Sequence, residues 1–200
     1  MMPITGDYIL AKSRTLLLLT LLVWGYGGAH PALAAKTAVI KDIKGVAHTL
    51  LDPARKATVF FFVTHDCPVS NRYAPEINRI CADYNSRNIA FYLVQVDADL
   101  TAAQARQHAQ DFGYRCPVLL DRAHTLVKKA GATVTPEAAV LSADGKVLYR
   151  GRIDDWYAGY GKARPRPTRR DLRLALDEVL KGETVSIART KSIGCFIAGQ

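Results

Sequence analysis

The chain of 200 residues has only four cysteines, Cys67, Cys81, Cys116 and Cys195, and no two of them form a C-x-x-C pair. The missing pairs argue against a structural zinc site, and no C-x-x-C-H run is present for covalent haem attachment. We therefore expect no metal site and no cofactor. Four cysteines allow up to two disulfides, and whether any form among Cys81, Cys116 and Cys195 is open.

Long apolar runs are also scarce, and after residue 35 no segment is long enough to span a bilayer. Before it, Lys12 and Arg14 precede an apolar run over 15–29, and residues 32–34 supply the Ala-Leu-Ala pattern of a cleavage site. The run is shorter than the roughly 20 residues of a membrane anchor. We predict a signal peptide at 1–35, one exported domain at 36–200 with a tail from 183, and a periplasmic or secreted protein without a stable membrane span after cleavage.

Acidic residues are fewer than basic ones, with 18 Asp and Glu against 27 Lys and Arg, so the formal net charge is +9. A basic excess can serve nucleic-acid binding, but predicted export argues against that partner, and we expect none. Much of the excess lies in residues 162–173. This cluster is either a solvated basic face or a docking face for an acidic partner or an anionic lipid surface, and the sequence does not decide between them.

The strongest positive signal is an apolar run, residues 59–63, that is followed by Cys67. The run is β-branched or aromatic throughout, which predicts a central strand buried on both faces. Pro68 suits the first position of a helix, and apolar residues recur behind it at helical spacing through Tyr84. A cysteine at a helix N-terminus favours the thiolate. A buried structural thiol is the alternative for Cys67 and the preferred interpretation for Cys81, which lies on the apolar stripe of that helix.

The other segments alternate between strand and helix patterns. They are a hairpin at 39–51, strands at 89–96 and 118–120, helices at 101–112 and 124–130, a second hairpin of strands 138–141 and 147–152, and a final helix from Thr168 to Leu180. This order predicts an α/β fold, with a central mixed β-sheet flanked by helices and an N-terminal β-hairpin.

Four segments in this order resemble the exported redoxins of the alkyl hydroperoxide reductase and thiol-specific antioxidant group, within the thioredoxin superfamily. They are residues 63–76 (VTHDCPVSNRYAPE), 117–121 (PVLLD), 131–137 (GATVTPE) and 149–155 (YRGRIDD). The resemblance covers about residues 39–197 and implies a thioredoxin-like fold. It also implies that Cys67 is the reactive thiol, that Pro136 is cis beside it, and that the Thr135 backbone faces an extended substrate.

Two positions depart from the family pattern. Dithiol members carry a second cysteine three residues after the first, where this chain has Ser70. Thr64 matches the threonine that supports the nucleophile in peroxiredoxins, but the proline four residues before that threonine is Phe60 here. Both a protein disulfide and a peroxide are therefore open as substrates.

We predict a thiol-based oxidoreductase in which the Cys67 thiolate attacks a disulfide or a peroxide. A distant cysteine, or an external thiol such as a thioredoxin-like reductant, then resolves the product. Cys195 is our first candidate for the resolving cysteine, because Gly194 lets the tail approach another site. Cys116 is the second candidate, and a structural Cys116–Cys195 disulfide is an open alternative.

Other residues of the 64–68 loop receive supporting roles. Thr64 is expected to donate a hydrogen bond to the thiolate. His65 either lowers the pKa of Cys67 or is an exposed histidine without a role. Together with Thr135 and Pro136, His65 and Pro68 are expected to line the substrate site.

Two hypotheses of other kinds compete with the enzyme. The first is a non-catalytic module that handles copper or haem during assembly of an exported electron-transfer protein, since His65, Cys67 and Cys195 are soft ligands suited to Cu(I). An inactive relative of the redoxins is the second. It predicts that Cys67 reacts with maleimide no faster than free cysteine does.

Overall fold

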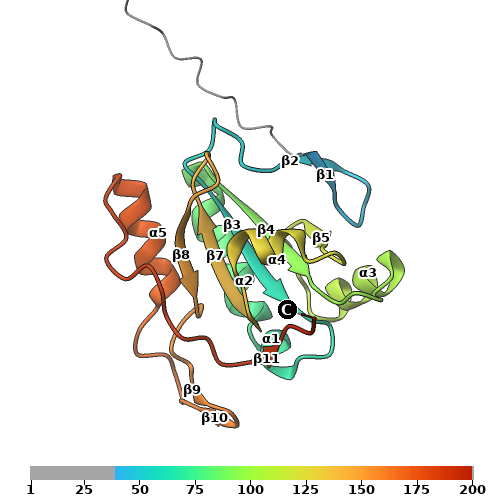
Figure 1. The fold of residues 1–200 in the computed structure, drawn as a ribbon. Helices are drawn as coiled ribbons and strands as arrows, with labels where there is room; N and C mark the ends of the chain where they lie inside the picture. Colours follow the sequence, from blue (N-terminus) through green and yellow to red (C-terminus); the bar gives the residue numbers. More distant parts are fainter. Residues whose placement is uncertain (1–38, 200) are drawn as a thin grey trace, which may run out of the picture. The chain divides into compact units, whose positions relative to one another are not determined.

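A five-stranded sheet in the order β5-β4-β3-β7-β8 forms the centre of the fold (Figure 1). The computed structural model describes residues 39–199, so the predicted signal peptide lies outside the described residues. The strands are β3 (Ala57–Val63), β4 (Ile89–Gln95), β5 (Val118–Leu120), β7 (Glu137–Leu141) and β8 (Val147–Gly151). β4 and β5 continue the sheet parallel to β3, whereas β7 pairs antiparallel with β3 and β8 antiparallel with β7. The predicted mixed sheet is confirmed.

Helices cover both faces of this sheet. They are α1 (Pro68–Arg72), α2 (Ala74–Tyr84), α3 (Ala102–Asp111), α4 (Thr125–Ala130) and α5 (Asp171–Lys181). Alternate residues of β3 point to opposite faces. Phe61 belongs to a core that includes Ile77 of α2 and Leu172 of α5, and Phe62 belongs to a core on the other face that includes Val127 of α4. Every residue of β3 is buried, so packing on both sides holds the strand in position. Its C-terminal end therefore fixes where the loop to Cys67 begins.

Shorter strands complete the architecture. The predicted N-terminal hairpin is present as β1 (Val39–Lys41) and β2 (Ala47–Thr49). The sequence patterns did not predict the pair β9 (Tyr157–Gly159) and β10 (Lys162–Ala163), nor the pair β6 (Val134–Thr135) and β11 (Cys195–Phe196). Within residues 39–199 the helices are all too short or too polar to cross a membrane.

The helix expected to run unbroken from Pro68 to Tyr84 is in fact two helices, α1 and α2. Tyr73 separates them. The physical cause is Pro75, which has no N–H to donate and whose ring would clash with the Asn71 carbonyl in a continuous helix. The Cys67 loop therefore leads into a short helical turn of its own.

The start of the last helix also differs from the prediction, because α5 begins at Asp171 rather than after a Thr168 cap. Asp155, which is buried, accepts hydrogen bonds from the Thr168 backbone N–H (2.7 Å) and from its hydroxyl. Part of the positive charge of residues 162–173 is paired within the protein. Arg173 Nε donates a hydrogen bond to Glu76 Oε1 of α2 at 2.9 Å. That ion pair helps to hold α5 beside α2.

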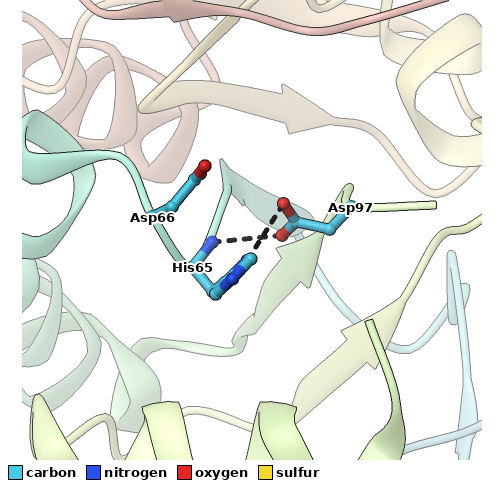
Figure 2. A group of neighbouring side chains, drawn as sticks. All are labelled: His65, Asp66 and Asp97. Carbon is cyan, nitrogen blue, oxygen red and sulfur yellow. Dashed lines mark hydrogen bonds and ion pairs between the residues drawn. The ribbon is translucent and has the colours of Figure 1, made fainter. Parts of the chain in front are cut away.

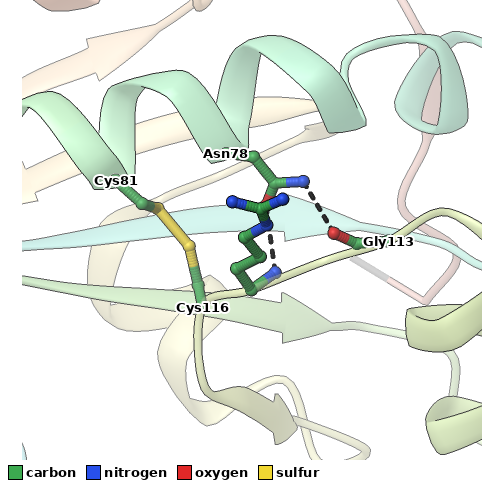
Figure 3. The surroundings of a disulfide bond; sticks show 5 residues. Asn78, Cys81, Gly113 and Cys116 are labelled. Atoms are coloured by element: carbon green, nitrogen blue, oxygen red, sulfur yellow. Dashed lines mark hydrogen bonds between the residues drawn. A yellow bond between two sulfur atoms is a disulfide. The ribbon is translucent and has the colours of Figure 1, made fainter.

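Cys81 and Cys116 form a disulfide between α2 and the loop that precedes β5 (Figure 3). Asn78 adds two hydrogen bonds across the same junction, from its Nδ2 to the Gly113 carbonyl (2.7 Å) and to its Oδ1 from the Arg115 backbone N–H (2.9 Å). The interpretation of Cys81 as a buried free thiol is therefore wrong. α2 brings Cys81 to Cys116 in the fold, although 35 residues separate them in the sequence.

Candidate redox site

Cys67 is the N-cap residue of α1, directly after the loop that leaves β3. Its sulfur accepts a hydrogen bond from the Ser70 backbone N–H at 3.5 Å, and Pro68 occupies the first helical position as predicted. Only 1% of Cys67 is exposed, and its Sγ lies 3.3 Å from the Thr135 carbonyl oxygen. The cysteine is therefore held in place by backbone groups from two separate segments.

The Thr135–Pro136 peptide bond is cis, as the resemblance implied. It follows β6, so the buried Thr135 places its carbonyl against Cys67. The Thr64 and Thr135 hydroxyls lie 3.1 Å apart and hydrogen-bond to each other. Thr64 thus braces the Thr135 segment and does not donate to the sulfur as predicted.

Cys195 lies directly over Cys67, with 2.8 Å between the two sulfur atoms. It gets there because β11 pairs antiparallel with β6, which places Cys195 opposite Thr135. Cys67 and Cys195 are both free thiols in the structure. Cys116 is in the disulfide with Cys81, so the ideas that Cys116 resolves Cys67 or pairs with Cys195 are wrong.

The two facing sulfurs differ in acidity. Burial opposes ionisation of Cys67, but hydrogen bonds from Cys195 and from Ser70 outweigh it and lower the pKa of the Cys67 thiol. Burial and the neighbouring Cys67 raise the pKa of Cys195 to about 12. The arrangement therefore favours a Cys67 thiolate that accepts a hydrogen bond from a Cys195 thiol, a contact that the sequence did not reveal.

Ser70 occupies the position of the second cysteine of dithiol redoxins. It is fully buried, and within residues 39–199 its hydroxyl oxygen has no hydrogen-bond partner, although it lies close enough to the Cys67 sulfur to help lower the pKa of that thiol. A buried hydroxyl without a partner is costly unless its proton is used. Directing that proton to the thiolate satisfies both groups.

The His65 side chain points toward Asp97 (Figure 2). Its Nδ1 lies 3.2 Å from Asp97 Oδ1, and its backbone N–H donates to Asp97 Oδ2 at 3.1 Å. The pKa of Cys67 is lowered by Cys195 and Ser70 rather than by His65. His65 instead lines a cleft of about 510 Å³ beside Cys195 and Phe196.

The structure brings together two of the three proposed Cu(I) ligands, the Cys67 and Cys195 sulfurs, but not His65 with them. Among the described residues, the group whose possible ligand atoms all lie within 4.8 Å of one another is His65, Asp66 and Asp97, with neither cysteine (Figure 2). Two carboxylates and one imidazole are harder ligands than Cu(I) prefers. Two of these side chains, His65 and Asp97, contact each other directly, which explains why they lie close together without a metal ion.

A buried polar chain, which the sequence analysis did not identify, supports the Cys67 loop from behind. His108 of α3 has Nδ1 2.8 Å from the Gln95 amide and Nε2 2.8 Å from Asn71 Oδ1. Asn71 Nδ2 donates to the His65 carbonyl at 3.0 Å. Burial lowers the pKa of His108, so the neutral imidazole is favoured. No motif marks these residues, because they meet only when α3 packs beside the loop.

The acidity of Cys67 gives a direct prediction for Cys195→Ala. This variant lacks the thiol that donates to Cys67, so the pKa of Cys67 should rise. Because only the thiolate is alkylated, the midpoint of the iodoacetamide rate against pH should lie below that of an ordinary cysteine in the native protein and move to higher pH in the variant. The control is Phe196→Ala, which alters an exposed neighbour and should leave the midpoint unchanged. An equal midpoint in Cys195→Ala would contradict the assignment.

The fold and the site together define a thioredoxin-like redox protein. A central strand delivers Cys67 to a helix N-terminus, and a cis-proline segment lies against its sulfur. The chain belongs to the Redoxin family, whose family model matches residues 33–156.

Known relatives agree with this class. Over 114 residues the chain is 23% identical to the thiol-disulfide oxidoreductase ResA of Bacillus thuringiensis (strain Al Hakam), covering 57% of this chain and 65% of the relative. The chain thus spans just under two thirds of the length of that curated relative. An uncharacterized conserved protein from Geobacillus kaustophilus is similar in structure, with TM-score 0.70 and 26% identity over 83% of this chain and 90% of the other. A putative thiol:disulfide interchange protein DsbE from Chlorobium tepidum has the same fold, with TM-score 0.56 and 18% identity over 73% and 94% of the two chains.

Proposed function

We propose that the protein is a thiol-disulfide oxidoreductase whose redox pair is Cys67 and Cys195. The observation that carries the proposal is the 2.8 Å approach of the two sulfurs next to the cis-proline segment. A disulfide bond between them would need only a small further approach, since bonded sulfurs are about 2.05 Å apart. The pair would thus replace the C-x-x-C dithiol that the sequence lacks.

The proposed reaction has two exchange steps. The Cys67 thiolate attacks one sulfur of a protein disulfide, forming a mixed disulfide and releasing the other sulfur of that disulfide as a thiolate, which takes a proton from solvent. Cys195 then gives up its proton and attacks the Cys67 sulfur, so the substrate leaves as a dithiol and the Cys67–Cys195 disulfide remains. Two electrons pass from the protein to its substrate. An external thiol or a thioredoxin-like reductant restores the dithiol.

Two further expectations belong to this proposal. The name of the ResA relative supports disulfide exchange, whereas reduction of a peroxide stays a prediction from the sequence resemblance. Export to the cell envelope also stays a prediction. The Cys81–Cys116 disulfide supports it, because such bonds persist mainly in oxidising compartments.

The proposal is tested by oxidising the reduced protein with one equivalent of oxidised glutathione and mapping the products by mass spectrometry. We expect the native protein to lose two thiols and yield a linked Cys67–Cys195 peptide. Cys195→Ser should instead accumulate a glutathione adduct on Cys67. A parallel reaction with hydrogen peroxide compares the two substrate classes.

Cys67→Ser is the matched control and should leave Cys195 much less reactive than Cys67 is in the native protein, because burial still raises the pKa of Cys195 when Cys67 is gone. If Cys195 reacts as fast without Cys67 as with it, the nucleophile is wrongly assigned. If no Cys67–Cys195 peptide forms, the proposed redox pair is wrong.

A further inference from the structure

The sulfur of Cys67 is closed off by the chain's own tail. Only 1% of Cys67 is exposed, and the Cys195 sulfur stands 2.8 Å away. An attacking thiolate has to meet a disulfide sulfur at close range. A partner's sulfur can therefore reach Cys67 only by taking the place that Cys195 holds.

The tail holds that place as a β-strand on the edge of β6. Cys195 lies opposite Thr135 and Phe196 opposite Val134, and the Ile197 backbone N–H donates to the Thr133 carbonyl at 3.0 Å. Pairing of this kind uses main-chain groups, so another extended polypeptide can make the same bonds.

Three side-chain positions along the tail meet different conditions. A Cβ on Gly194 would overlap the Thr135 carbonyl oxygen, so no side chain fits there while the strand is in place. Ile197, two residues after the cysteine, is buried in the core that includes Phe62 and Val127. Phe196, between them, is 79% exposed. The site thus demands glycine before the cysteine and an apolar residue two positions after it, and leaves the intervening residue free.

We infer that residues 193–197 are a built-in copy of the substrate, and that the β6 edge accepts extended partner segments of the form Gly-Cys-x-apolar, with the cysteine in a disulfide. The inference rests on the proposed function and names its substrate class. The partner segment exchanges with the tail on the same edge. When the tail pairs again with β6, it displaces the partner segment and returns Cys195 to Cys67. The same movement therefore allows Cys195 to resolve the mixed disulfide and releases the substrate.

The test uses a variant whose tail is off the edge, Gly194→Ala/Cys195→Ala, with deletion of residues 192–200 as a second tail-free form. Each receives three pentapeptides whose cysteine is joined to thionitrobenzoate. One copies residues 193–197, Ile-Gly-Cys-Phe-Ile. The others replace its glycine by alanine or its last isoleucine by serine.

The Cys67 thiolate attacks the peptide sulfur, the new bond joins Cys67 to the peptide, and the coloured thionitrobenzoate anion leaves. Its release gives the rate, which is divided by the rate of the same peptide with glutathione. We expect the copy of the tail to react roughly tenfold faster than either altered peptide, because each altered peptide loses one local fit. Cys195→Ser, which keeps Gly194 and the paired strand, should react more slowly with all three.

The outcomes distinguish an error in the substrate class from an error in the proposed function. Equal corrected rates for the three peptides in both tail-free forms would overturn the substrate class while leaving Cys67 as a working nucleophile. Equal rates in Cys195→Ser and in the tail-free forms would overturn the exchange with the tail. Failure of Cys67 to outpace glutathione with any peptide, in the native protein as well as in the variants, would reject the proposed function itself.

Discussion

Removal of the Cys81–Cys116 disulfide is expected to lower the free energy of unfolding by about 4 kcal/mol. The bond joins residues 35 apart, and a cross-link of that length removes roughly this much conformational freedom from the unfolded chain. Such a loss is a large share of the roughly 5–15 kcal/mol that stabilises a typical domain. The double variant Cys81→Ala/Cys116→Ala and urea denaturation under non-reducing conditions measure it.

The matched control is Cys67→Ala/Cys195→Ala, which also removes two cysteines but keeps the disulfide. We expect a much smaller loss of stability there, because these two sulfurs are not bonded to each other in the structure. The cross-link variant should also show a steeper dependence of unfolding free energy on urea, since its unfolded chain is more expanded. Equal unfolding midpoints for the two double variants would mean that the cross-link is not formed in the native protein.

Ser70→Cys is expected to redirect the redox pair from the tail to the helix. The Ser70 backbone N–H already donates to the Cys67 sulfur at 3.5 Å, and residues three apart share one face of a helix. The Ser70 hydroxyl oxygen is buried without a hydrogen-bond partner among the described residues, so replacing it by sulfur breaks no hydrogen bond there. After mild oxidation we expect the disulfide between Cys67 and the introduced cysteine to exceed Cys67–Cys195 roughly tenfold or more, because a cysteine on the same helical turn stays beside Cys67 whether or not the tail is paired with β6.

Peptide mapping of the oxidised variant measures this ratio, and Cys195 should then be open to alkylation. Ser70→Ala serves as the control and should keep the Cys67–Cys195 disulfide. It should also raise the pKa of Cys67, since one of the groups that stabilises the thiolate is gone. A predominant Cys67–Cys195 disulfide in Ser70→Cys would show that β-pairing of the tail outweighs the local geometry of the helix.

Local pattern was a sound guide wherever neighbouring residues decide the structure. The unbroken apolar run of β3 predicted a strand buried on both faces, and the Thr101 and Gln104 pair predicted the capping box that starts α3. The prediction failed where a second interaction outweighed the local pattern. Helical spacing predicted one helix through Tyr84, but Pro75 breaks it into two. Thr168 was predicted to cap the last helix, but it hydrogen-bonds to Asp155 instead.

The sequence by itself determined the order along the chain of the five strands of the central sheet, the placement of Cys67 at a strand–helix junction and, through a family resemblance, the cis-proline. These follow from residues within a few positions of one another. Only the tertiary structure decided which cysteines meet. Cys81 pairs with Cys116 because α2 packs beside the loop before β5, and Cys195 reaches Cys67 across 128 residues because β11 pairs with β6. Such pairings depend on main-chain bonds and on packing between distant segments, which leave no periodic trace in the sequence.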